Sequence, residues 1–127
     1  MANVNLTTQV RKINDRLSVV DIVGEVTGFA ETILMNAYLQ ASSGMDHAVL
    51  FNFTNLEYMN SSGIGLLVTI LVRAQRAKLK LMACGLSEHY RQIFELTRLS
   101  EAIGLFNTEE DAVAAVVGMP NKPLEAV

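Results

Sequence analysis

The amino-acid sequence predicts an α/β domain with a mixed sheet, and three observations support this prediction. Segments with strand character alternate with segments of helical periodicity along the chain, which is typical of α/β domains. Residues 47–53 are apolar on both faces of the expected strand, which favours a central, covered position in a sheet. The strands expected at residues 8–13 and 17–26 are close enough to pair as a hairpin, whereas later strands are separated by helical crossovers.

Five elements are expected in the first half of the chain. They are an edge strand, a second strand, a helix, the central strand and a loop, at residues 8–13, 17–26, 29–40, 47–53 and 54–60. The second strand is rich in Val and Ile at period two, and Ser42-Ser43-Gly44 stops the helix. In the central strand, one face carries Val49, Phe51 and Phe53.

The second half is expected to hold three helices and two strands. The helix at 61–77 is followed by a strand at 79–83, a helix at 88–97, an edge strand at 104–106 and a helix from residue 109. Ser87 and Thr108 are the expected N-caps of the last two helices. We expect one domain over residues 1–117 and a flexible tail over 118–127, which contains two prolines.

Composition bounds the possible functions. The chain has 127 residues, half of them hydrophobic, so it can bury a core. Its net charge of −3 does not suggest nucleic-acid binding. A basic cluster near the end of the helix at 61–77 is read as a complement to the helix dipole rather than as a phosphate-binding patch; it comprises Arg73, Arg76, Lys78 and Lys80.

The chain is expected to be cytoplasmic. Cys84 is its single cysteine, which fits a reducing compartment. The N-terminus carries no secretory pattern, and the most apolar stretch, residues 64–72, is too short to span a membrane.

No enzyme, metal site or cofactor is expected. His47, His89 and Cys84 are too few and too widely spaced for a zinc site. The chain contains no P-loop and no nucleophile elbow, and Gly63-Ile64-Gly65 is followed by Val68 where a dinucleotide fingerprint needs glycine.

Residues 58–65 are the informative segment. Asn60 and Ser61 are good N-cap residues, and Ser62 falls in the first turn of the expected helix. Unpaired N–H groups converge at a helix N-terminus, so the domain would tolerate a phosphate on a serine at this place. The alternative is that both serines only cap the helix.

The following helix is apolar around much of its circumference. One stripe at helical spacing predicts a core face, formed by Ile64, Leu67, Val68, Leu71 and Val72. Leu66 and Ile70 lie outside it. Either this helix is deeply buried or these residues form a contact face for a partner.

Residues 55–65, Asn-Leu-Glu-Tyr-Met-Asn-Ser-Ser-Gly-Ile-Gly, resemble the signature loop of STAS domains, the family of bacterial anti-sigma factor antagonists. The resemblance continues through residues 24–26, 85–87, 94–99 and 105–112. It implies a mixed sheet of four or five strands with helices mainly on one face.

The resemblance also implies partner switching. The unphosphorylated protein would bind an anti-sigma factor with serine-kinase activity, and that kinase would phosphorylate Ser61, less favourably Ser62; a serine phosphatase would reverse the reaction. The expected partner-binding residues are Met59, Asn60, Ser61, Ser62, Ile64 and Leu66. The family commonly has Asp where this chain has Asn60 and Thr27. The alternative function is a STAS interaction or scaffold subunit that binds its partner without phosphorylation.

Overall fold

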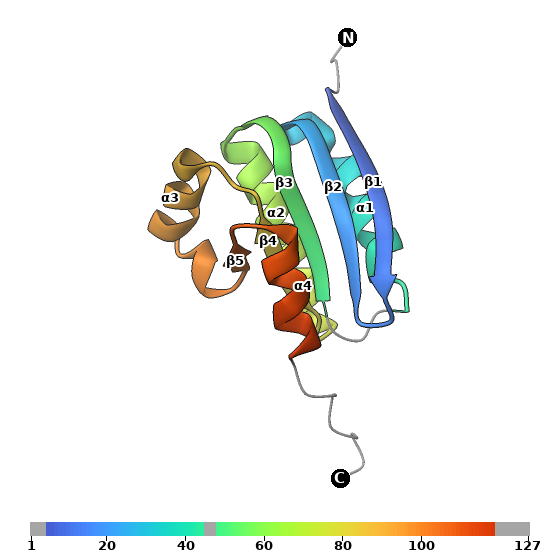
Figure 1. Ribbon diagram of the computed structural model, residues 1–127. Helices are drawn as coiled ribbons and strands as arrows, with labels where there is room; N and C mark the ends of the chain where they lie inside the picture. The colour runs from blue at the N-terminus through green and yellow to red at the C-terminus, as the bar shows by residue number, and fades with distance from the viewer. Residues whose placement is uncertain (1–4, 45–47, 119–127) are drawn as a thin grey trace.

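The computed structural model describes residues 5–44 and 48–118 and shows a five-stranded mixed sheet with four α-helices (Figure 1). The strands are β1 (Leu6–Asn14), β2 (Leu17–Val26), β3 (Ala48–Met59), β4 (Lys80–Cys84) and β5 (Gly104–Phe106). The helices are α1 (Glu31–Ser42), α2 (Ser61–Arg76), α3 (Glu88–Leu96) and α4 (Glu109–Val117), with short 3-10 helices η1 (Gly28–Ala30) and η2 (Leu99–Glu101). His47 and all of the tail expected at residues 118–127 except Gly118 lie outside the described residues.

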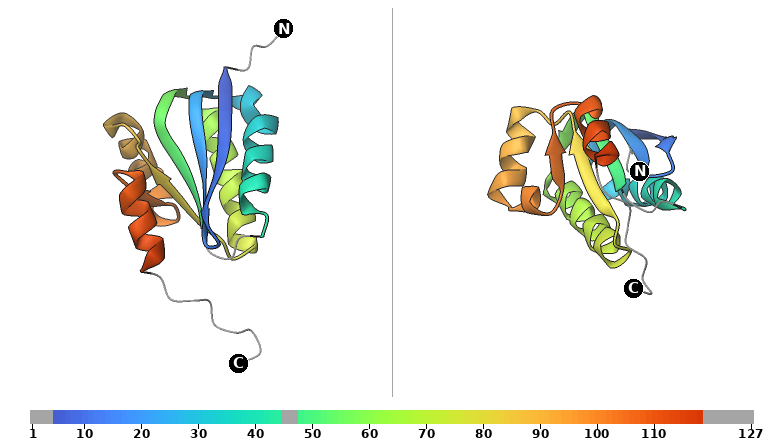
Figure 2. Two further views of the ribbon diagram at one scale, coloured as in Figure 1. Left: turned by 45° about the vertical axis from the view of Figure 1, so that its right-hand side comes forward. Right: turned by 60° about the horizontal axis from the view of Figure 1, so that its bottom comes forward.

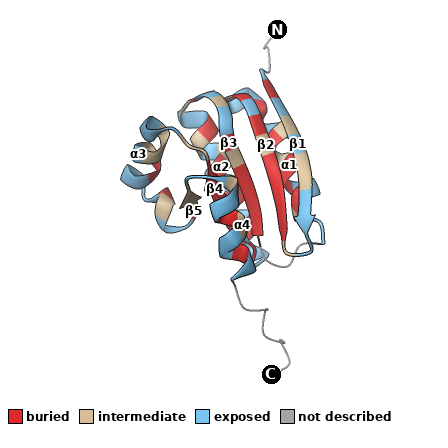
Figure 3. Cartoon of the chain, in the orientation of Figure 1, coloured by how far each residue is buried: buried red, intermediate tan, exposed pale blue. Residues whose placement is uncertain are grey.

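The strand order follows the chain, from β1 to β5. The β1–β2 pair is antiparallel and the other three pairs are parallel, so the predicted mixed sheet is confirmed. Helices α1 and α2 lie on one face of the sheet and α4 lies on the other (Figure 2). Both faces of the central strands are therefore covered over part of their length (Figure 3).

The main core lies between the sheet and helices α1, α2 and α3. Phe51 and Phe53 of β3 project into it, and the ring of Phe53 meets the fully buried ring of Phe94 from α3 edge to face. A smaller core lies on the α4 side, where Ala112 and Val116 pack against the sheet. The division into two cores matches the two apolar faces that the sequence indicates for the central strand.

The predicted loop at residues 54–60 is wrong, because β3 continues to Met59. The ladder with β2 extends to the pair Val26–Met59 and accommodates two register shifts on the way. Backbone hydrogen bonding to β2 does not depend on side-chain polarity, so the strand outlasts the apolar run by which it was recognised. The site therefore begins at the end of a paired strand.

The predicted core stripe of α2 is also partly wrong. Val68 and Val72 are each 40% exposed, while Ile70 is buried. The buried face is formed by Gly63, Leu67, Ile70, Leu71 and Ala74. This rotation of the helix follows from a close approach of Gly63 to β2, described below. Ile70 is thus apolar because it is deeply buried, and Leu66 is partly buried against the same core.

Candidate functional site

The serine pair lies where β3 passes into α2, with Asn60 as the only intervening residue. Asn60 has an extended backbone, and its Oδ1 accepts a hydrogen bond from the Gly63 N–H at 2.9 Å. The Ile64 N–H donates to the Asn60 carbonyl at 3.0 Å. Asn60 is therefore the N-cap of α2, which confirms one of the two capping residues that the sequence offers.

Gly63 brings the first turn of α2 into direct contact with the end of β2. A Cβ at this position would lie 2.1 Å from the Val26 carbonyl oxygen. The same carbonyl accepts a hydrogen bond from the Asn60 N–H at 3.3 Å. The absence of a side chain at residue 63 thus sets both the position of the loop and the rotation of α2.

Tyr90 of α3 holds the other side of the loop. Its hydroxyl accepts a hydrogen bond from the Met59 N–H at 2.8 Å, across 31 positions in the sequence. β4 pairs with β3 only as far as Asn52, so this N–H lies beyond the reach of the β4 ladder. A tyrosine hydroxyl replaces the missing strand partner at the end of β3.

Ser61 and Ser62 are both exposed at the first turn of α2. Ser62 stands beside η1, because a Cβ built on Gly28 would lie 3.3 Å from the Ser62 Cβ. The Ser61 and Ser62 N–H groups precede the first intrahelical bond, and neither donates to an acceptor within the described part of the chain. The turn therefore presents two hydroxyls and two free amides to solvent.

Apolar side chains flank the serines. Phe29, next to Gly28 in η1, is 66% exposed, and Tyr58 is 48% exposed. Ile64 and Leu66 are partly buried. Met59 is only 4% exposed and belongs to the core, so its side chain is not available to a partner in this conformation.

Sequence reasoning missed Phe29, which it placed at the start of a helix. Thr27 instead caps the separate turn η1, its Oγ1 accepting from the Phe29 N–H. The Thr27-Gly28 pair was the available signal, since a hydroxyl residue followed by glycine favours a turn.

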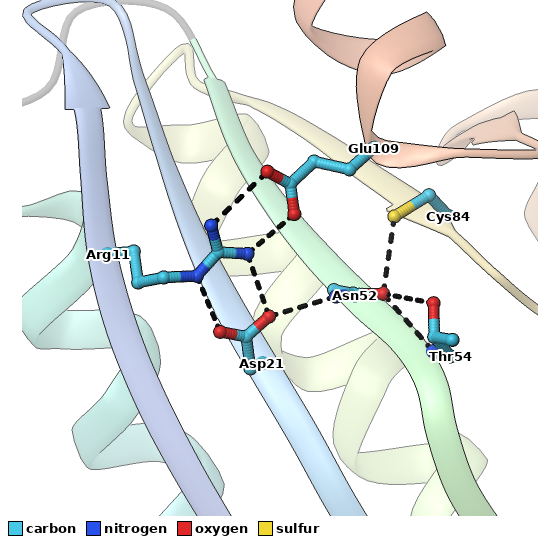
Figure 4. Close-up of polar contacts among 6 residues, drawn as sticks. All are labelled: Arg11, Asp21, Asn52, Thr54, Cys84 and Glu109. Atoms are coloured by element: carbon cyan, nitrogen blue, oxygen red, sulfur yellow. Dashed lines mark hydrogen bonds and ion pairs between the residues drawn. The ribbon is translucent and has the colours of Figure 1, made fainter.

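A second polar cluster, also missed, lies on the α4 face of the sheet (Figure 4). The Arg11 guanidinium of β1 forms ion pairs with Asp21 of β2 and Glu109 of α4. Its Nε and Nη2 donate to the Asp21 carboxylate at 2.6 and 2.9 Å. The Arg11 hydrogen bonds, with one from Asn52, hold the pKa of Asp21 below its usual value although burial opposes this. Because these residues come from three elements, the cluster fastens α4 to the sheet.

Asn52 extends this cluster towards Cys84 (Figure 4). Its side-chain amide donates to Asp21, and its Oδ1 accepts from the Thr54 hydroxyl at 2.6 Å and from the Cys84 thiol at 3.5 Å. Burial raises the pKa of Cys84 to about 11. The thiol therefore stays protonated at neutral pH, and nothing in this cluster prepares it as a nucleophile.

The described part of the chain has no feature typical of a metal site or of a membrane-spanning helix. Residues 5–44 and 48–118 contain no group of three or more acidic, histidine or cysteine side chains placed to hold a metal ion. In the same residues, no helix has both the length and the apolar character needed to cross a membrane.

A sequence model of the STAS domain matches residues 8–112 of the chain, from β1 into α4. The chain belongs to the STAS family. The matched residues include the β3–α2 junction and its serine pair. Among curated proteins, none matches the chain significantly.

Solved structures confirm the STAS fold. An anti-sigma factor antagonist from Mycobacterium paratuberculosis is 23% identical, with a TM-score of 0.73 over 88% of this chain and 94% of the other. The unphosphorylated form of the anti-sigma factor antagonist SpoIIAA is 21% identical, with a TM-score of 0.67 over 89% and 100%. A sulfate transporter family protein from Wolinella succinogenes is 13% identical, with a TM-score of 0.70 over 86% and 89%. At these identities the likeness establishes the fold alone.

Proposed function

We propose that this STAS domain is a cytoplasmic partner-switching regulator, an antagonist of an anti-sigma factor. In its unphosphorylated state it binds an anti-sigma factor with serine-kinase activity through the first turn of α2 and the adjacent apolar side chains. Phosphorylation of Ser61 by that kinase releases the partner, and a serine phosphatase restores binding. The domain acts by binding and not by catalysis.

The observation that carries this proposal is the exposed Ser61 hydroxyl at the first position of α2. Ser62 is the less suitable acceptor because its side chain stands against η1. The free amides of this turn and the positive end of the helix dipole favour a phosphate, so the modified domain stays folded.

The switch acts on affinity because the phosphate adds about 1.5 to 2 negative charges at neutral pH. Exposed Phe29 and Tyr58 and partly buried Leu66 give the surroundings of Ser61 an apolar character. A partner that covers these side chains must desolvate the charged phosphate, which is unfavourable unless it supplies a matching cation. A loss of about 3 kcal/mol weakens binding more than a hundredfold.

The test uses the partner that the wild-type chain captures from its own cells, identified by mass spectrometry and then purified. Calorimetry should show that Ser61→Asp lowers affinity at least a hundredfold, whereas Ser61→Ala and Ser62→Ala bind like wild type. Gln75→Glu, an exposed change near the far end of α2, controls for the added negative charge and should bind normally. Kinase treatment should place phosphate on wild type and on Ser62→Ala, but not on Ser61→Ala.

A second function is a STAS interaction subunit that binds its partner without phosphorylation. Asn60 and Thr27 favour it, because each stands where the family commonly has Asp and each is engaged as a neutral cap. Normal binding by Ser61→Asp, together with no phosphate on Ser61 in protein from native cells, would support this function and contradict the switch.

A further inference from the structure

A pocket of about 580 Å³ lies between the C-terminal ends of α1 and α2. It is lined by Tyr38, Leu39, Ser42, Arg73, Arg76, Ala77 and Leu79. Its volume falls within the usual range for small-molecule sites. Arg73 and Arg76 follow the serine pair by 11 to 15 residues along α2, and a helix rises about 1.5 Å per residue, so the pocket is roughly 20 Å from the serines.

The pocket combines apolar surface with hydroxyl groups. Tyr38 and Leu79 are almost fully buried and supply apolar surface, while Leu39 is 44% exposed. Tyr38 and Ser42 both line the pocket, and the Ser42 hydroxyl donates to the Leu39 carbonyl at 3.3 Å. An aromatic or short aliphatic group could therefore lie against side chains that are already ordered by the core.

The charge of the pocket is positive beyond what the helix ends require. Two helix C-termini together carry about −1 elementary charge, and the two arginines carry +2. The lining contains no acidic residue. Within residues 5–44 and 48–118, no carboxylate forms an ion pair with Arg73 or Arg76. Among the described residues, Arg73 and Arg76 are therefore the charged groups that line the pocket.

The two guanidiniums are also suitably placed with respect to each other. Arg73 and Arg76 are exposed and three residues apart, so they lie on neighbouring positions of one helix face. Guanidinium groups bind phosphate and carboxylate oxygens through paired hydrogen bonds. The dipole of α2 explains the presence of one cation in its last turn, but it does not require two neighbouring arginines beside an apolar pocket.

We propose that this pocket binds a small molecule that carries one phosphate or carboxylate group on an apolar body. The anion lies between Arg73 and Arg76, and the body packs on Tyr38, Leu39 and Leu79. This site does not depend on phosphorylation of Ser61, because it lies at the opposite end of α2.

The test uses phenyl phosphate as the probe, with ¹⁵N-labelled full chain followed by NMR. Saturable shifts are expected for the amides of residues 38–42 and 73–79, with a Kd below about 1 mM. Inorganic phosphate and phenol, added separately, should each bind at least tenfold more weakly. Benzoate in place of phenyl phosphate tests whether a carboxylate is also accepted.

Variants assign the binding to the arginines. Arg73→Gln and Arg76→Gln should each weaken phenyl phosphate binding severalfold, and the double variant at least tenfold. Arg98→Gln removes an exposed cation just after α3, an element that does not line the pocket, and should bind like wild type. Both arginine side chains are exposed, so the variants are expected to keep the wild-type thermal midpoint.

Three results would overturn the proposal. Shifts confined to the amides of residues 60–64 would place the anion at the N-terminus of α2 instead. Unchanged binding by the double variant would exclude the arginines as ligands. Equal affinity for inorganic phosphate would show that the apolar surface contributes nothing and that the arginines attract any anion.

Discussion

Two glycines of α2, Gly63 and Gly65, should respond oppositely to the same substitution. In Gly63→Ala the new methyl group would lie 2.1 Å from the Val26 carbonyl oxygen and 2.8 Å from its carbon. An ordinary contact to carbon is about 3.5 Å or more, so α2 and β2 must separate by more than about 1 Å. Both clashing atoms are backbone, and no rotamer change relieves the overlap. We expect the free energy of unfolding to fall by about 2–3 kcal/mol.

Gly65→Ala is the matched control. A Cβ at residue 65 meets nothing within 4 Å, and the residue is exposed in the same helix. Replacing glycine by alanine there should raise the free energy of unfolding by about 0.5–1 kcal/mol through helix propensity. The two variants should therefore differ by about 3 kcal/mol.

Urea denaturation followed by circular dichroism measures both free energies under identical conditions. Equal stabilities for the two variants would refute the reasoning, because they would mean that α2 can move away from β2 without loss. Gly63→Ala should also disturb the amide resonances of residues 60–64, since the same contact positions the N-cap, whereas Gly65→Ala should leave the resonance of the capped Gly63 amide in place.

Two further predictions concern titratable groups on the α4 side. Because Arg11 lowers the pKa of Asp21, their pairing stabilises the fold above about pH 4, and this contribution is lost as pH falls through the folded-state pKa. Arg11→Gln should therefore lower the free energy of unfolding by about 1 kcal/mol at pH 7, a modest value because both groups are partly exposed. The loss should be smaller at pH 3. An equal loss at both pH values, measured by urea denaturation, would contradict the pairing. Burial raises the pKa of Cys84 from 9.0 to about 11, so folded protein at pH 8 should react with a disulfide reagent far more slowly than protein in urea, and stability should decline as pH rises from about 9 to 11. Rapid labelling of Cys84 in folded protein would show that the thiol is accessible.

Several features of the site could be predicted from the local sequence pattern. The N-cap at Asn60, the cap at Thr108 and the strand at residues 104–106 follow from residue types within a few positions of one another. Capping is a local interaction between a side chain and the next turn, so the sequence contains all of its determinants. The position of the serine pair at the start of a helix was predictable for the same reason.

The contacts that fix this site are not local. Tyr90 reaches Met59 across 31 positions, and Arg11 reaches Glu109 across 98. Nothing near either residue in the sequence distinguishes it from an ordinary helix or edge-strand residue. The polar cluster and the pocket between α1 and α2 exist only because strand order places their elements side by side.

The sequence by itself determined the order of strands and helices, the two apolar faces of the central strand and the exposed serine turn, because period and capping are encoded within single elements. The tertiary structure decided how far β3 extends and which side of α2 is buried. Strand length depends on the ladder with β2, and the rotation of α2 depends on a glycine meeting a carbonyl 37 residues earlier in the chain, Val26. Both are contacts between elements, and hydrophobic periodicity along one element carries no information about its neighbour.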